Sequence, residues 1–315
     1  MPTRLVSLWG KGGVGKSTLS VALGSYLASQ GRRVLVLTTD PMPSLGFLKE
    51  RVWGKSAYEN RLEVLELGEE EVIEKWKERF GDEVYYVVSS LLPVGREIID
   101  YVANAPGISD EFLLYLVYAK FTEDSYEYIV WDLPAASEAV RLLALESKVY
   151  AHMGDAFRLY LKVRGHLEKI VRHRRATPED LIRDWQKLAN DVLEMLRCEN
   201  HIPLLVTIPE PLGVYQAVNL YKELLRYGIR PRLLVVNMFF SASSECTSCR
   251  GWISKARVHG QSLKALEEHF KDKIELHIVP CLPLGEEPES DRQLLLRHIE
   301  PIGLKVLGAP ITRSA

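Results

Sequence analysis

The stretch that decides the fold is GKGGVGKST at residues 10–18, which follows the apolar run LVSLW at residues 5–9. Four glycines precede a lysine and two hydroxyl side chains, and apolar residues at helical spacing begin directly afterwards. The pattern predicts a buried strand, a glycine-rich turn and the start of a helix. Such a turn points backbone N–H groups at an anion, and the helix N-terminus adds partial positive charge. A phosphate-binding loop is therefore predicted here.

Residues 10–17 satisfy the P-loop pattern, and their place between a strand and a helix argues against a merely glycine-rich turn. Lys16 is expected to neutralise the β- and γ-phosphates of ATP, Ser17 to offer its hydroxyl to Mg²⁺, and Thr18 to reach the α-phosphate. The nucleotide-binding residues predicted in the loop are Gly12, Gly13, Val14, Gly15, Lys16, Ser17 and Thr18.

Short runs rich in Val, Leu and Ile alternate with longer helical patterns along much of the chain. This alternation predicts an α/β fold with a doubly wound, mostly parallel sheet, because parallel strands are buried on both faces. Helices are expected at residues 17–30 and 214–227. The expected strands cover residues 5–9, 33–38, 127–132, 203–207, 232–237 and 274–280.

Residues 138–201 interrupt this rhythm, since they contain no convincing strand. Two amphipathic stripes occur there, and an all-helical stretch between core strands is typical of an inserted subdomain. A second helical stretch, at about 69–121, is a candidate for the same subdomain, within one ATPase domain spanning residues 1–315. The two stripes are Phe157, Tyr160, Leu161, Leu167 and Ile170, and Leu181, Trp185, Leu188, Val192 and Leu196.

The composition excludes several classes of protein. The chain has 315 residues, 47% of them hydrophobic, and a formal net charge of -2, which argues against a dedicated nucleic-acid binder. It begins with no secretory signal, and no apolar run approaches the roughly 18 residues of a membrane helix. Four cysteines in a chain of this length do not form a disulfide scaffold. We therefore expect a cytoplasmic protein.

Two aspartates end predicted strands. Asp40 closes the run RVLVLTTD and Asp132 closes EYIVWD. Ligands of an open α/β sheet bind beyond the carboxyl ends of the strands, where acidic residues can orient water or contact a metal ion. Either aspartate alone could be a solvated helix cap. Together with the phosphate loop, they are interpreted as the switch I and Walker B positions.

Lys11 adds a second lysine to the loop, which then resembles the deviant Walker A motif KGGVGK[ST]. This motif is found in the clade of cell-division ATPases, nitrogenase iron protein and arsenical-pump ATPases. The resemblance implies a homodimer in which Lys11 reaches the partner's phosphates, whereas an exposed loop lysine is the alternative. The expected catalytic residues are thus Asp40, Lys11 and Lys16.

Further segments resemble one branch of this clade, the arsenical-pump and tail-anchored-protein-targeting ATPase family. They are TTDPMPSLGF (38–47), APGISDE (105–111), DLPAASEAVRLL (132–143), IPEPLGVYQA (208–217) and LLVVN (233–237). The resemblance implies that Asp40 positions the attacking water and that Asp132 is the Walker B residue. It also implies that Asn237 contacts the adenine edge and that Pro280 and Leu282 line the base pocket.

Cys246 and Cys249 form a C-x-x-C pair that resembles the zinc site of the targeting branch. Two thiolates from each subunit would complete a tetrahedral Zn²⁺ site shared across a homodimer. A redox-active pair and two incidental free cysteines are the alternatives. Cys198 and Cys281 are expected to be isolated, buried residues.

Three functions are open at this point. The favoured one is a dimeric ATPase that shields and delivers tail-anchored membrane proteins, reaching the membrane only through a receptor. The second is the ATPase subunit of an arsenite or antimonite efflux system, which needs three soft thiolates. The third is an iron–sulfur cluster scaffold, whose members also carry a late C-x-x-C.

Overall fold

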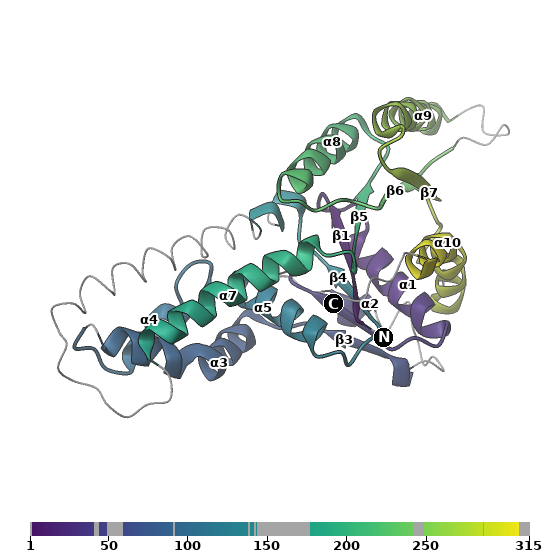
Figure 1. Cartoon of the computed structure of the whole chain (residues 1–315). Coiled ribbons are helices and arrows are strands. Elements are labelled where there is room, and N and C mark those ends of the chain that lie inside the picture. The colour runs from purple at the N-terminus through teal and green to yellow at the C-terminus, as the bar shows by residue number, and fades with distance from the viewer. Residues whose placement is uncertain are drawn as a thin grey trace. The chain divides into compact units, whose positions relative to one another are not determined.

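The chain divides into two compact units, which are described separately below (Figure 1). Unit 1 comprises Met1–Glu66, Ala119–Val140 and Arg197–Ala315, and unit 2 comprises Leu67–Tyr118 and Arg141–Leu196. The structure is a computed structural model that describes residues 2–40, 44–48, 59–90, 92–137, 139–141, 143, 177–241, 249–285 and 287–308.

Unit 1 is built on a seven-stranded sheet in the order β3-β2-β4-β1-β5-β6-β7. Every neighbouring pair of strands is parallel, which confirms the predicted doubly wound α/β fold. The parallel arrangement brings the carboxyl ends of all strands to one edge of the sheet. The strands are β1 (Arg4–Gly10), β2 (Val34–Thr38), β3 (Leu62–Leu65), β4 (Tyr128–Asp132), β5 (His201–Thr207), β6 (Leu233–Phe239) and β7 (Glu275–Pro280).

All six predicted strands are present, and the edge strand β3 was not predicted. β3 has four residues, LEVL, and only Leu62 is fully buried. Because an edge strand pairs on one side only and leaves part of its surface in solvent, it lacks the continuous apolar run of the central strands. Its pairing with β2, from Val34 opposite Leu62 onward, therefore comes from the structure alone.

Helices cover both faces of the sheet (Figure 1). One side has α1 (Lys16–Ser29) and α10 (Pro288–Gly308), whose buried side chains join those of β1 in one apolar core. α8 (Pro211–Arg226) and α9 (Arg250–Phe270) lie beside β5, β6 and β7, and the rings of Tyr221 and Phe270 meet edge-to-face between them. The unit also contains two short helical segments, α2 (Leu45–Leu48) and η2 (Glu59–Arg61).

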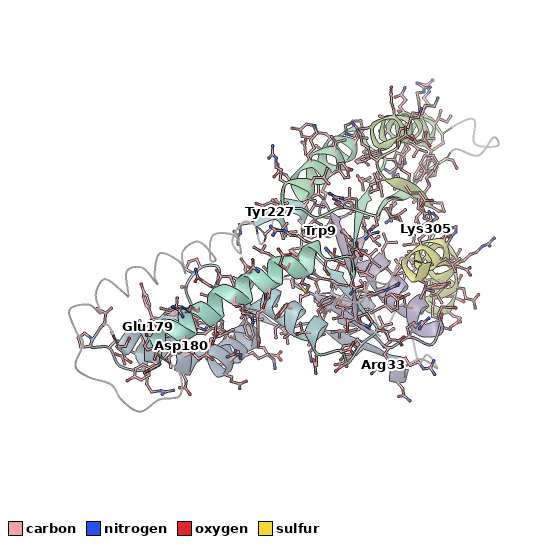
Figure 2. All side chains as sticks on the ribbon, viewed as in Figure 1. Trp9, Arg33, Glu179, Asp180, Tyr227 and Lys305 are labelled. Atoms are coloured by element: carbon pink, nitrogen blue, oxygen red, sulfur yellow. The ribbon has the colours of Figure 1, made fainter. Side chains whose placement is uncertain are left out.

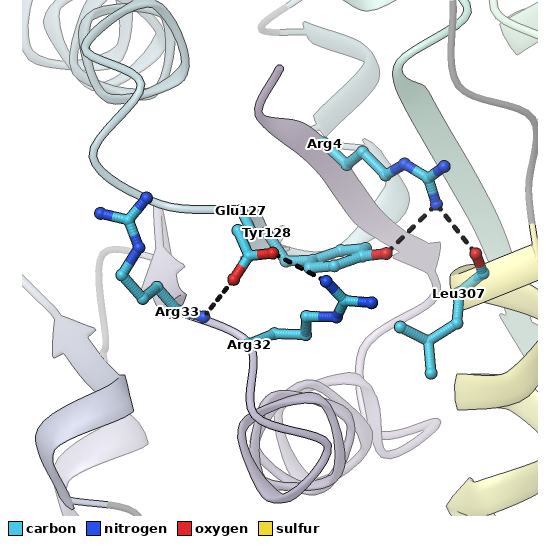
Figure 3. Close-up of polar contacts among 6 residues, drawn as sticks. All are labelled: Arg4, Arg32, Arg33, Glu127, Tyr128 and Leu307. Carbon is cyan, nitrogen blue, oxygen red and sulfur yellow. Dashed lines mark hydrogen bonds and ion pairs between the residues drawn. The ribbon is translucent and has the colours of Figure 1, made fainter. Parts of the chain in front are cut away.

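The end of α10 is fixed by a buried arginine. The Arg4 guanidinium donates to the carbonyl oxygens of Val306 (3.0 Å) and Leu307 (3.2 Å) and to the Tyr128 hydroxyl (3.2 Å; Figure 3). A cation at a helix C-terminus satisfies carbonyls that have no partner within the helix. On the surface, Lys305, labelled in Figure 2, adds an ion pair with Glu275 at 2.6 Å.

Unit 2 is helical. It contains α3 (Glu69–Ser89), α4 (Glu97–Ala103), most of α5 (Ile108–Thr122) and most of α7 (Pro178–Arg197). Its core is aromatic, with the Phe80 ring edge-to-face against Phe112 at 6.1 Å and against Tyr115 at 5.2 Å between ring centroids. Glu179 and Asp180 lie in the first turn of α7, where acidic residues suit the helix dipole (Figure 2).

The second predicted amphipathic stripe is confirmed, because its residues lie on α7 and turn inward. Val192 and Leu196 are buried, and Trp185 and Leu188 pack against the aromatic core. The first predicted stripe, from Phe157 to Ile170, lies outside the described residues. In the described part of the chain, no helix has the length and apolarity needed to cross a membrane.

Candidate functional site

The phosphate loop joins β1 to α1 at the carboxyl edge of the sheet. Gly15 caps α1 with a backbone φ of 90°, and Gly13 has a φ of 79°. Both values lie in the left-handed region that non-glycine residues rarely adopt. No side chain caps the helix N-terminus, so its backbone N–H groups face the loop rather than a capping residue. This arrangement fits a bound phosphate.

Gly10 is required by the close approach of two strands. A Cβ atom at this position would lie 2.3 Å from the backbone oxygen of Val206 on β5, which pairs directly with Gly10. At Gly13, by contrast, a Cβ would meet no atom of the described residues within 4 Å. The loop is therefore tightly packed where it leaves β1 and open at its turn, which leaves space for a ligand.

Lys16 is the first residue of α1, directly after the loop, and is buried. Its ammonium donates to the carbonyl oxygens of Gly10 (3.0 Å) and Lys11 (3.1 Å). A lysine held across the loop in this way can exchange carbonyl partners for phosphate oxygens. Ser17 and Thr18 follow on the first turn of α1, and Lys11 is half-buried in the loop.

Asp132 ends β4 beside the loop. In the sheet register it lies between Leu8 of β1 and Thr38 of β2. Its carboxylate accepts hydrogen bonds from Ser17, and from Ser20 and Thr38 at 3.4 Å each. Burial, and to a lesser degree the Asp40 carboxylate, raises the pKa of Asp132 to about 6, against the opposing effects of Ser17, Lys16 and Ser20. The phosphate loop and the predicted Walker B aspartate thus lie in hydrogen-bonding contact.

Asp40 follows β2 on a short segment that is hydrogen-bonded to β4. Its backbone N–H donates to the Thr38 hydroxyl (3.1 Å), which also donates to the backbone oxygen of Asp132 (3.1 Å). The next contact comes from Trp131, whose indole N–H donates to the Thr39 hydroxyl at 3.1 Å. The hydrogen bonds of Thr38 with Asp132 and of Thr39 with Trp131 therefore hold the segment that leads to Asp40 against β4. Residues 41–43 of the predicted switch I lie outside the described residues.

Asn237 contacts the phosphate loop itself. Its side-chain amide donates to the backbone oxygen of Val14 at 2.8 Å. The next residue, Met238, has a φ of 56°, which is unusual for a non-glycine residue and coincides with a register shift between β6 and β7. Phe239 then pairs with Pro280, and Leu282 follows two residues later. Asn237 thus lies in the last half of β6 and Pro280 ends the neighbouring strand β7, and contact of Asn237, Pro280 and Leu282 with adenine stays a prediction.

The cysteines are spread over the chain. Cys249 is exposed at the start of α9, and Cys246 lies outside the described residues. The expectation that Cys198 and Cys281 are buried was wrong, since Cys198 is half-buried and Cys281 is exposed. Cys281 follows the last residue of β7, where the strand leaves the core. Over the described residues, no group of three or more His, Cys, Asp or Glu side chains could hold a metal ion.

Sequence reasoning missed three contributors to this site: Ser20, Thr38 and Trp131. Ser20 follows Ser17 by three residues on α1, so helical spacing alone could have placed both hydroxyls on one face. Thr38 and Trp131 contact their partners across the pairing of β2 with β4, over sequence separations of 94 and 92 residues. No local pattern carries that information.

Comparisons with known proteins agree with this geometry. The family model described as "Anion-transporting ATPase" matches residues 3–286. "ATPase get3" of Aspergillus niger is 26% identical over 309 residues, covering 92% of this chain and 88% of that protein. "ATPase GET3" of Podospora anserina is also 26% identical, with the same coverage of each chain.

A bacterial relative carries a different name. "Putative arsenical pump-driving ATPase 2" of Aquifex aeolicus is 25% identical over 283 residues, covering 85% of this chain and 90% of that protein. Since the family model spans most of the chain and the phosphate loop has the required geometry, this protein belongs to the anion-transporting ATPase family, a family of ATPases that includes the Get3 and arsenical-pump proteins.

Proposed function

We propose that this chain is a Mg²⁺-dependent, homodimeric ATPase that shields tail-anchored membrane proteins in the cytoplasm and delivers them to a membrane receptor. The observation that carries the proposal is that one chain contains two different units. Unit 1 holds the phosphate loop and its aspartates, and unit 2 is helical with an aromatic, apolar interior. We assign the described helices of unit 2, which are α3, α4, most of α5 and most of α7, to the inserted helical subdomain predicted at about residues 138–201 and 69–121.

The proposed chemistry of unit 1 follows from its contacts. Bound Mg²⁺·ATP would supply the γ-phosphate whose transfer to water releases free energy. Lys16 neutralises phosphate charge, and Ser17 presents its hydroxyl to the metal while donating to the ionised Asp132 carboxylate. Asp40 orients the attacking water. Its backbone N–H donates to the Thr38 hydroxyl, which in turn contacts Asp132 at the end of β4. Lys11 acts on the phosphates of the partner subunit.

The client role is tested by keeping a transmembrane segment in solution. The full chain is mixed with a tail-anchored substrate and Mg²⁺·ATP, and the substrate left after centrifugation is measured. We expect the wild type to hold the substrate, and Lys16→Ala, which loses the charge that faces the phosphates, to release it. A wild-type dimer that hydrolyses ATP yet holds no more substrate than Lys16→Ala would contradict the client role while leaving the ATPase assignment intact.

The proposed dimer includes a shared Zn²⁺ site made by Cys246 and Cys249 of both subunits. The exposure of Cys249 at the start of α9 supports it, because a shared site needs thiols that reach a second chain. We expect half an equivalent of zinc per chain, lost in Cys249→Ser together with part of the dimer. Cys281→Ser, another exposed cysteine, is the matched control and should keep the metal. Metal-free wild-type protein, or iron in place of zinc, would contradict this part of the proposal.

A second candidate function is the ATPase of an arsenical pump, which the similarity to the Aquifex aeolicus protein favours. That function needs three thiolates near one another. Cys198, Cys249 and Cys281 do not form such a group. Stimulation of ATP hydrolysis by antimonite would favour the pump, whereas hydrolysis that is indifferent to antimonite and responds to a tail-anchored substrate would favour the targeting function.

A further inference from the structure

Unit 2 contains an apolar cavity of about 290 Å³ between α3, α4, α5 and α7. Five aromatic rings contribute to its wall, and aliphatic side chains supply most of the rest. Among the described residues that line it, Glu111 alone carries a carboxyl group. The lining residues are Trp76, Phe80, Val84, Val88, Val102, Ile108, Glu111, Phe112, Tyr115, Trp185, Leu188, Ala189 and Val192.

The polar ends of two lining aromatics are already engaged. The indole N–H of Trp185 donates to the Glu83 carboxylate at 2.7 Å, and the Tyr115 hydroxyl accepts from Arg79 at 3.2 Å. Arg79 and Glu83 pair with each other at 2.8 Å. Because these contacts use the polar groups of Trp185 and Tyr115, both residues offer the cavity their ring surfaces.

Glu111 differs from these residues. Over the described part of the chain, its side chain has no hydrogen bond or ion pair, and its neighbour Asp110 is paired with Arg141 at 3.0 Å. Burial, assisted by Asp110, raises the pKa of Glu111 to about 7. Glu111 is half-buried, so its carboxyl group is partly removed from water without gaining a protein partner, and a cationic ligand would offset that desolvation. The described contacts of the phosphate loop and of Asp132 do not include Glu111.

We propose that this cavity binds a small apolar ligand with one positive charge, such as an alkylamine, whose ammonium group pairs with the Glu111 carboxylate. Phe112, which follows Glu111 on α5, supplies an aromatic ring to the same cavity, and the aliphatic wall takes the hydrocarbon chain. The Tyr115 ring already has the Arg79 guanidinium 5.8 Å from its centroid. Aromatic surfaces next to a carboxylate are a recurring way to bind alkylammonium groups.

The size of the cavity separates this ligand from a membrane-protein client. A transmembrane helix is about 30 Å long and about 10 Å wide, so its volume exceeds the cavity several-fold. A volume of about 290 Å³ lies at the lower end of the range for small-molecule sites. The ligand site therefore stands independently of the client role.

Calorimetric titration of the nucleotide-free full chain at about pH 8 tests the proposal with two probes of equal chain length. Octylamine is positively charged at this pH, and 1-octanol is neutral. We expect octylamine to bind at one saturable site about tenfold more tightly than 1-octanol, because it gains a charge-assisted hydrogen bond in an apolar setting. In Glu111→Gln, which keeps the shape and loses the charge, the two affinities should differ by less than about twofold.

Two further variants complete the test. Glu78→Gln changes an exposed carboxylate on α3 and should preserve the preference for octylamine. Ala189→Phe fills the cavity from α7 and should abolish binding of both probes. Equal affinities of the wild type for octylamine and 1-octanol, a preference that survives in Glu111→Gln, or uptake that never saturates would each overturn the proposal. The Glu111→Gln comparison decides the matter even where Ala189→Phe does not fold.

Discussion

At the residue scale, the site depends on a few hydrogen bonds between neighbouring strand ends. The loop residues were predictable because their pattern is local: glycines at fixed spacing, then Lys16 and Ser17. The environment of Asp40 was not, because the Trp131 donor lies 92 residues away from Thr39 in sequence. Only the pairing of β2 with β4 brings the two together. The local geometry of the site was thus predictable where one turn supplies it, and not where strand register does.

Trp131→Phe should lower the turnover number for ATP by about fivefold with little change in KM, because it removes one hydrogen bond worth about 1 kcal/mol from the segment before Asp40. Trp9→Phe is the matched control. Trp9 is equally buried and meets Trp131 edge-to-face at 6.2 Å, but its N–H donates to Ser7. Steady-state kinetics of both variants provide the comparison, and equal turnover in the two would refute a role for Trp131 in positioning Asp40.

The raised pKa of Glu111 predicts that the stability of the folded chain depends on pH. Its folded-state pKa of about 7 lies above the ordinary value of 4.5, so the folded chain retains a proton that the unfolded chain loses. This group's contribution to stability therefore falls as pH rises from about 4.5 to about 7 and is constant above that range.

Glu111→Gln removes this titration. We expect the melting temperature of the variant, relative to wild type, to be higher at pH 8 than at pH 5 by about 2 °C. Differential scanning calorimetry at both pH values measures it, with Glu78→Gln as the control that should show no such trend. A variant whose relative melting temperature is the same at both pH values would show that Glu111 titrates normally.

At the scale of elements, the central strands and the long helices followed from apolar patterning, whereas β3 did not. Central parallel strands are buried on both faces and read as continuous apolar runs, but LEVL at the edge does not. The docking of α10 is a second feature beyond sequence patterning, because Arg4 lies 302 residues from Val306. An arginine in the first strand gives no indication that it caps the last helix.

Arg4→Met should lower the free energy of unfolding by about 2 kcal/mol, because carbonyl oxygens at the end of α10 lose a charged donor within a buried site. Arg33→Met is the control, since the Arg33 side chain is exposed and its contact with Glu127 is made by the backbone N–H (Figure 3). Urea unfolding of both variants tests the point. Equal midpoints would mean that Arg4 does not stabilise the helix end.

At the scale of the whole molecule, sequence similarity places the chain in a family whose relatives carry two kinds of name, Get3 ATPase and arsenical pump-driving ATPase. The P-loop predicts hydrolysis and not its purpose. The purpose depends on unit 2 and on the cysteines, and Cys246 and residues 144–176 lie outside the described residues. Biochemistry on the full chain must therefore distinguish a targeting factor from a pump subunit.

The most direct test of the whole account is phosphate release from Mg²⁺·ATP by the purified chain, measured together with nucleotide affinity. We predict hydrolysis by the wild type, and loss of both binding and hydrolysis in Lys16→Ala. Asp40→Asn should bind ATP normally and hydrolyse it at least about 100-fold more slowly, since it loses the group that orients water. A wild type without Mg²⁺-dependent hydrolysis, or an Asp40→Asn variant with normal turnover, would contradict the account at its centre.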